Sequence, residues 1–321
     1  MTQVRTALAG AQICGLMSAM TDPYALHHSF VNVAARAPQL WRVALVVVGF
    51  EVIFALSPDI MMIFLSGEAA RDAYLEGTSA FGTLAQFFTF VIGCVGLVML
   101  LNLVHGRGFW SLIGPAQSAW RNLCAVAWGV ALVLLAQELL PPWYDLGSGV
   151  EVRPFARWLL LIPVTLLALL VQVGTEEMLF RGYLQQQFAC LSKQRWVWMG
   201  IPSIMFGGLH YWNGNGATEG LMWALWATML GAACADLTAR SGNLGAAVGL
   251  HLANNAFAIL LYGISGWAGT GVALFLFPYV DPIEYSAEIS ALPTPWIIFQ
   301  VAGQMLSVLV MWLAARIAIR K

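Results

Sequence analysis

The chain has 321 residues, 60% of them hydrophobic and 10% charged, and its formal net charge at pH 7 is −1. Soluble domains carry about 25% charged residues, so this composition excludes an ordinary soluble protein and predicts one that crosses a membrane several times. A charge this close to zero lends no support to a nucleic-acid partner, and we expect none.

The apolar residues come in long unbroken runs. Only α-helices and closed β-barrels satisfy every backbone polar group in lipid, and a barrel would instead show alternating segments of about ten residues. The expected fold class is therefore all-α, a polytopic membrane protein that forms a single membrane domain over residues 1–321. The five cysteines are scattered without CxxC or zinc-site spacing, which predicts free thiols.

The N-terminal segment has a weak likeness to a signal peptide, with Arg5 followed by a mostly apolar stretch at 7–20. Gly10, Gln12 and Gly15 interrupt the apolar centre of that stretch. We therefore expect the segment to be retained, and residues 1–39 to form an interfacial arm.

Eight transmembrane helices are expected, if a span is taken as about 20 apolar residues. The fifth is short and contains Pro202 and the pair Gly207-Gly208, which predicts a kinked or partly spanning helix. No internal repeat is evident, which disfavours a transporter built from inverted halves. The expected spans are 40–57, 80–104, 119–140, 157–180, 196–212, 219–237, 243–264 and 296–317.

Lysine and arginine are unevenly shared between the loops, and cytoplasmic loops carry the excess of these residues. Placing both termini in the cytoplasm leaves Arg71, Arg153 and Arg157 outside and Arg181 within the fourth span. The other basic residues then lie inside, namely Arg5, Arg36, Arg42, Arg107, Arg121, Lys193, Arg195, Arg240, Arg316, Arg320 and Lys321. The charge bias therefore agrees with an even number of spans.

The fourth span ends in Gly-Thr-Glu-Glu-Met-Leu-Phe-Arg, residues 174–181. A charged residue at the centre of a membrane helix costs about 2.5 to 3.5 kcal/mol on insertion scales, so such residues are candidates for a functional site. Residues four apart share a helical face, which predicts an ion pair between Glu177 and Arg181. Glu176 points elsewhere, and we interpret it as the working carboxylate.

Two histidines fall in apolar spans that follow this one. His210 closes Phe-Gly-Gly-Leu-His in the fifth span, and His251 lies in the seventh with Asn255 four residues later on the same face. A single buried histidine is more often a structural residue than a catalyst. Two of them in a chain that also buries a Glu-Glu pair favour a shared cavity, formed by the helices of 157–260 as a catalytic core of four consecutive helices.

Activation of a water molecule is the chemistry that fits these residues. A desolvated Glu176 suits a general base, and His210 could hold the same water or pass a proton to the leaving amine. His251 and Asn255 could donate hydrogen bonds to an oxyanion. In the alternative, Glu176, His210 and His251 bind a divalent metal such as zinc or iron. We favour the mechanism without a cofactor, because the metal gives Asn255 a less direct role.

Other polar and small residues in the spans have simpler interpretations. Phe206 is a possible substrate contact, although an aromatic residue in a membrane helix usually serves packing. Gly245 and Gly249 predict a close helix crossing just before His251. Glu51 lies in mid-span without a basic partner in its own helix; we expect it to bond to another helix, and the alternative is that it lines the cavity.

Three motifs occur in order on successive predicted helices: EExxxR at Glu176, Glu177 and Arg181, FxxxH at Phe206 and His210, and HxxxN at His251 and Asn255. Together they resemble the motifs of the type II CAAX prenyl endopeptidase and bacteriocin-processing family (CPBP or Abi proteins). The likeness covers roughly residues 157–260, about a third of the chain.

The resemblance implies an eight-helix intramembrane endopeptidase whose active site faces the cytoplasmic side. It assigns Glu176 as the base, His210 to the water, His251 and Asn255 to the oxyanion, and it implies that Glu177 and Arg181 brace the site. The expected partners are the lipid bilayer and a membrane-bound peptide or protein substrate, which could be prenylated or otherwise lipid-modified. The alternative is a non-catalytic membrane scaffold or immunity protein that retains the protease fold.

Overall fold

The structure, a computed structural model, describes residues 22–140 and 149–320. The described chain is mainly helical and has the expected character of a polytopic membrane protein. The likeness to a signal peptide at 7–20, and most of the expected arm at 1–39, lie outside the described residues. The described end of that arm forms a short helix, α2 (Ala25–Val31).

The first three expected spans are present as long helices. They are α3 (Leu40–Phe64), α5 (Ala80–His105) and α7 (Ala116–Leu139). The short helices α4 (Glu68–Glu76) and α6 (Trp110–Ile113) connect them. We expected the first span to end at residue 57, before Pro58. The helix instead continues through that proline, which removes a single backbone donor and does not end the apolar run.

The fourth span is longer than expected. Helix α8 (Phe155–Glu177) continues through a π-helical turn, η1 (Met178–Leu184), into α9 (Gln185–Leu191). The whole stretch of 37 residues is apolar enough to cross a membrane. The expected span ends at residue 180, and polar residues follow it. Those residues are buried against other helices, and the helix continues through them.

The remaining spans include two short ones. A π-turn, η2 (Trp196–Gly200), leads into α10 (Ile201–His210) and the turn η3 (Tyr211–Asn213), as expected for a short fifth span. The long helix α11 (Ala217–Ser241) is followed by the shorter α12 (Gly245–Leu261), and the last helix is the long α14 (Thr294–Ile319). Six described helices are long and apolar enough to span a membrane, while α10 and α12 are shorter.

Part of the connection between α12 and α14 is ordered as strand and helix, which the sequence analysis did not predict. Three short strands, β1 (Glu151–Val152), β2 (Tyr262–Ile264) and β3 (Phe275–Phe277), form a sheet in the order β1-β3-β2. The β1–β3 pair is antiparallel and the β2–β3 pair is parallel. Helix α13 (Pro282–Ala291) follows, with its first turn capped by the Asp281 carboxylate.

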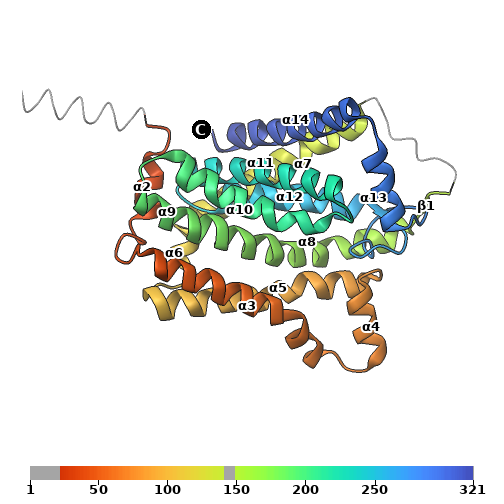
Figure 1. The fold of residues 1–321 in the computed structure, drawn as a ribbon, viewed down its shortest axis with the longest axis horizontal. Coiled ribbons are helices and arrows are strands. Elements are labelled where there is room, and N and C mark those ends of the chain that lie inside the picture. Colours follow the sequence, from red (N-terminus) through yellow and green to blue (C-terminus); the bar gives the residue numbers. More distant parts are fainter. Residues whose placement is uncertain (1–21, 141–148, 321) are drawn as a thin grey trace, which may run out of the picture.

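The helices lie side by side and divide the connections between two ends of the bundle (Figure 1). Helices α2, α6 and α9 and the C-terminus lie at one end, and α4, α13 and β1 lie at the other. The loops that we expect inside the cell therefore share one end. Which end faces the cytoplasm stays a prediction.

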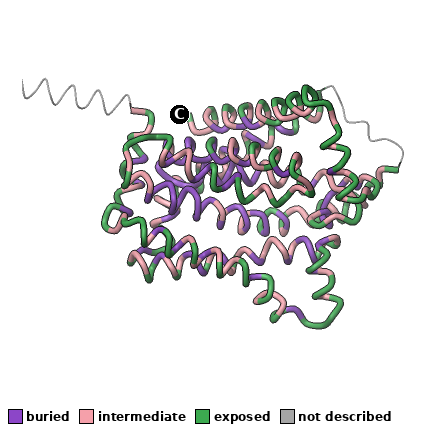
Figure 2. The backbone as a smooth tube through the Cα atoms, in the orientation of Figure 1, coloured by how far each residue is buried: buried purple, intermediate pink, exposed green. Residues whose placement is uncertain are grey.

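Buried residues are concentrated in the middle of the bundle, along α8, η1, α11 and α12 (Figure 2). Helix α12 lies directly against α7, and glycine allows this contact. A Cβ atom at Gly245 would lie 1.9 Å from the Ala119 carbonyl oxygen, and one at Gly249 would lie 2.6 Å from that of Leu123. The expected close crossing before His251 is therefore confirmed, and it sets the position of α12 beside α8.

Candidate active site

The predicted ion pair on the fourth span is present and completely buried. Arg181 Nη1 donates to Glu177 Oε1 at 2.9 Å, and neither side chain is exposed. Arg181 lies within the π-turn η1, and its guanidinium also packs over the Phe206 ring, 4.6 Å from the centroid. π-Turns interrupt helices frequently at functional sites. The π-turn η1 places Arg181 beside the Glu177 carboxylate and the Phe206 ring.

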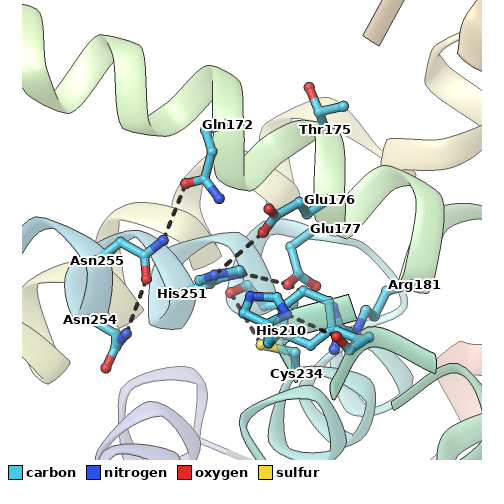
Figure 3. A network of polar contacts seen from close by, with 12 residues as sticks. Gln172, Thr175, Glu176, Glu177, Arg181, His210, Cys234, His251, Asn254 and Asn255 are labelled. Carbon is cyan, nitrogen blue, oxygen red and sulfur yellow. Dashed lines mark hydrogen bonds and ion pairs between the residues drawn. The ribbon is translucent and has the colours of Figure 1, made fainter. Parts of the chain in front are cut away.

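His251 links α12 to the Glu-Glu pair (Figure 3). Its Nδ1 donates to Glu177 Oε1 at 2.9 Å, while its Nε2 lies 3.7 Å from Glu176 Oε2. His251 is 2% exposed. Because Nδ1 carries the proton toward Glu177, a neutral ring presents Nε2 as an acceptor. His251 therefore donates to an oxyanion only as an imidazolium.

The Glu176 carboxylate is less buried than that of Glu177 and has fewer hydrogen-bond partners among the described residues. Its carboxylate is partly accessible, at 18% exposed, whereas that of Glu177 is at 0%. The Oε2 atom of Glu176 is buried and has no hydrogen-bond partner among the described residues. The Glu177 carboxylate is thus held by Arg181 and His251, and the Glu176 carboxylate is available to a ligand. The ion pair is the one expected from the sequence, and the role of Glu176 as the base stays a prediction.

His210 comes from α10 and lies beside these groups (Figure 3), and Phe206, one turn earlier on the same helix, packs against Arg181. His210 Nδ1 donates to the Phe206 carbonyl oxygen at 2.8 Å, so a neutral ring leaves Nε2 as an acceptor. The Phe206 ring lies 4.4 Å from the His210 ring and 5.7 Å from that of His251. Phe206 is only 1% exposed. Its contacts favour a packing role, and substrate contact stays a prediction.

Asn255 is oriented by a residue that the sequence analysis did not select. Its Nδ2 donates to Gln172 Oε1 at 3.1 Å, and its Oδ1 accepts from Asn254 Nδ2 at 3.0 Å (Figure 3). Gln172 lies four residues before Glu176 on α8. A glutamine one turn before a carboxylate in an apolar span was the available signal.

A cavity of about 1100 Å³ joins these side chains. Glu176, His210, His251 and Asn255 all line it, so the structure brings the four expected catalytic residues to one space. Helices α3, α5, α11, α13 and α14 complete its wall with many aromatic side chains. Glu51 lines the same cavity, which agrees with the alternative interpretation of that residue, and no hydrogen bond joins it to another described helix.

Two glycines make room for the site. A Cβ atom at Gly231 on α11 would lie 2.6 Å from Arg181 Nη2 and 3.3 Å from the Phe206 ring. One at Gly207 would lie 1.9 Å from Thr228 Oγ1. Gly208 has open space around its Cβ position, so it takes no part in the contact of α10 with α11. Sequence reasoning did not identify Gly231, because its role depends on which helix lies opposite.

The donor set for a metal is less favourable than the residue types suggest. No group of three His, Cys, Asp or Glu side chains among the described residues is placed to hold an ion. In both histidines Nδ1 bonds to an oxygen, so Nε2 is the nitrogen left for a ligand. Glu176, His210 and His251 are nevertheless not among the groups placed to hold an ion, and no step is assigned to a metal.

Comparison with known proteins bears on the segment that carries these residues. Residues 158–257 match the family described as "Type II CAAX prenyl endopeptidase Rce1-like". The matched segment runs from α8 into α12 and contains all three motifs, which confirms the resemblance over that segment. It supports the fold of a CAAX-type intramembrane protease.

A curated protein of Bacillus subtilis (strain 168), "Uncharacterized protein YyaK", is 26% identical over 169 residues. The similarity covers 50% of this chain and 55% of YyaK, so the chain spans about half the length of that relative. No solved structure matches the chain.

Proposed function

We propose that this chain, whose residues 158–257 match the Rce1-like endopeptidase family, hydrolyses a peptide bond of a membrane-associated substrate with water activated by Glu176. The observation that carries the proposal is the contrast between two adjacent carboxylates. Glu177 is completely buried and held by Arg181 and His251, while Glu176 is 18% exposed, lines the cavity and accepts no hydrogen bond from a described residue.

In the proposed reaction Glu176 accepts a proton from water as the water oxygen attacks the carbonyl carbon of the scissile bond. The carbonyl π-bond opens and the oxygen carries the negative charge. As the C–N bond breaks, the proton passes to the leaving nitrogen from Glu176, or through the unprotonated Nε2 of His210. The products are a carboxylate and an amine, and no covalent enzyme intermediate forms.

The negative charge of the tetrahedral intermediate needs a donor. Asn255 supplies an amide N–H at the cavity wall, with its orientation fixed by Gln172. His251 adds a second donor when its ring is protonated between the two carboxylates. Removing one such donor typically costs about 10² to 10³ in kcat. The chain thus carries a base, a water-holding residue and donors for the oxyanion within one cavity.

Two further features belong to the proposal. The charge bias of the loops favours a cytoplasmic location for both termini, with the active site open to that side. The mechanism without a metal is part of this proposal, and a purified assay with and without a chelator tests it. Unchanged turnover with the chelator agrees with the Glu176 mechanism, and loss that zinc restores would favour the metal.

The main alternative is a non-catalytic scaffold or immunity protein with the same fold. Such a protein would not need the four cavity residues, yet Glu176, His210, His251 and Asn255 are all present. Their presence favours the enzyme.

The deciding experiment compares peptide termini in membranes from cells that make the wild type or Glu176→Gln at equal levels. Mass spectrometry should find new termini with the wild type only. Glu68→Gln on the distant helix α4 is the matched control and should retain them. Identical termini from wild type and Glu176→Gln, with both proteins folded, would contradict the proposal and favour the scaffold.

A further inference from the structure

The carboxylates that line the cavity have no lysine or arginine beside them in its described lining. Three carboxylates line it, from Glu51, Glu176 and Glu219, and its described lining includes no lysine or arginine. Arg181 lies behind the site and is fully buried against Glu177. The two histidines of the lining, His210 and His251, are the groups there that can become positive.

Two of these carboxylates have local partners and one does not. Glu219 accepts from the Asn215 backbone N–H at 2.9 Å in the first turn of α11. Glu176 lies 3.7 Å from His251. No hydrogen bond or ion pair joins half-buried Glu51 to another described residue.

An ionisable residue inside a membrane span is costly and is ordinarily paired. Glu51 lies near the middle of α3, one of the membrane-length helices, and faces the cavity. Since no described residue pairs with Glu51, its carboxylate is free to pair with a group on the molecule that enters the cavity.

The aromatic rings near Glu51 indicate which kind of side chain its carboxylate would bind. Phe54 lies one helical turn after Glu51, and its ring centroid is 5.8 Å from that of Phe50 and 5.0 Å from that of Phe90. All three rings line the cavity with Glu51. Aromatic faces attract cations and also cover the methylene groups of lysine and arginine. A carboxylate flanked by such rings suits a basic side chain.

We propose that Glu51 is a specificity-determining residue that receives a lysine or arginine side chain of the bound peptide. The cleaved segment is therefore a basic apolar one, and a free C-terminal carboxylate near Glu51 is disfavoured. This inference rests on the proposed function, because it assumes that the cavity binds peptide.

The test measures binding rather than cleavage. Short apolar peptides that carry a dansyl acceptor and differ at one central position, Lys, Gln or Glu, are titrated into nanodiscs of zwitterionic lipid. The nanodiscs contain the Glu176→Gln protein, and binding is followed by energy transfer from tryptophan, with Trp223 and Trp226 in the cavity wall as near donors. Empty nanodiscs are subtracted, and thermal unfolding confirms that each protein is folded.

The Lys peptide should bind about tenfold more tightly than the Gln peptide, and the Glu peptide more weakly than either. The added change Glu51→Gln should abolish the Lys preference, Glu51→Lys should reverse it toward Glu, and Glu68→Gln should leave it intact. Equal binding of the Lys and Gln peptides, or a preference that survives Glu51→Gln, would overturn the inference.

Failure of the proposed function has a different signature. If the wild type produces no termini in membranes but the Lys preference depends on Glu51, the enzyme is rejected and the recognition of a basic peptide stands. If termini appear without dependence of binding on Glu51, the enzyme stands and this inference falls.

Discussion

Glu177 Oε1 lies 2.9 Å from His251 Nδ1, and this contact joins α8 to α12 across the buried centre of the bundle. It places the histidine proton on the side away from the cavity. The carboxylate that faces the cavity, Glu176, then meets the other ring nitrogen. Adjacent glutamates thus have different surroundings because one residue from a later helix lies between them (Figure 3).

The pair of Glu177 and Arg181 predicts a large loss of stability when one partner is removed. Glu177→Ala leaves the Arg181 charge buried and uncompensated, so we expect about 3 to 5 kcal/mol of destabilisation. Denaturant or thermal unfolding in detergent measures the effect. The double variant Glu177→Leu, Arg181→Leu should recover much of that stability without activity. A Glu177→Ala protein as stable as the wild type would show that the pair contributes nothing to the fold.

Gly231 predicts a steric effect on the same ion pair. In Gly231→Ala the new methyl would lie 2.6 Å from Arg181 Nη2, and the arginine cannot move away without losing Glu177. We expect about 1 to 3 kcal/mol of destabilisation together with reduced cleavage. Gly208→Ala is the control, because nothing lies within 4 Å of that position. Equal stability of the two variants would contradict the close approach of α11 to Arg181.

The hydrogen bond between Gln172 and Asn255 predicts coupling in catalysis. Gln172→Leu should lower kcat by about tenfold, because Asn255 loses the partner that orients its amide, and Asn255→Ala should lower it by about 10² or more. In a double-mutant cycle the second change should add little to the first. Effects that simply add would mean that Gln172 acts apart from Asn255. Both variants should retain the unfolding temperature to within a few degrees.

His27 on α2 predicts a pH dependence in the docking of that helix, outside the spans. Burial lowers the pKa of His27 from 6.5 to about 4, and its Nε2 accepts from Gln185 Nε2 at 3.3 Å. Between pH 4 and pH 6.5, His27 is protonated when α2 is undocked and neutral when α2 is docked. Docking is therefore fully stable above pH 6.5 and weakens as the pH falls, by up to about 3 kcal/mol near pH 4.

Hydrogen exchange of the α2 amides at pH 7 and pH 5 measures this weakening, after correction for the intrinsic rate. His27→Phe keeps an aromatic ring to stack on Trp198, which His27 contacts at 4.4 Å, but cannot be protonated. Its protection should be insensitive to pH. The same pH dependence in His27→Phe would mean that another group controls docking.

Local spacing predicted the parts of the site that lie within one helix. The Glu177–Arg181 pair follows from the separation of four residues, and the apolar runs gave the long helices. The contact of His251 with Glu177 could not be predicted in this way, because it depends on the close crossing of α12 with α7. The same holds for the space that Gly231 leaves for Arg181.

The continuation of the helix past residue 180, the end of the expected span, has a related cause. Arg181 and the three glutamines that follow it are typical of a segment leaving the membrane. In the structure these glutamines are buried, and Gln186 accepts from Arg107 while Gln185 donates to the Ala235 carbonyl. A polar run ends a span when its neighbour is water. Here its neighbours are other helices, and one sequence does not reveal which of the two surrounds it.

All eleven residues from 177 to 187 are buried, on every side of the helix, and the elements that cover them include three later ones, with α10 packed on Arg181, α11 on Gln185 and α12 on Glu177. During synthesis these covering helices are made later than the segment they cover. A charged pair and three glutamines are poorly tolerated in bare lipid. The fourth span therefore cannot settle into the bilayer by itself, and its final placement has to await the C-terminal half of the chain.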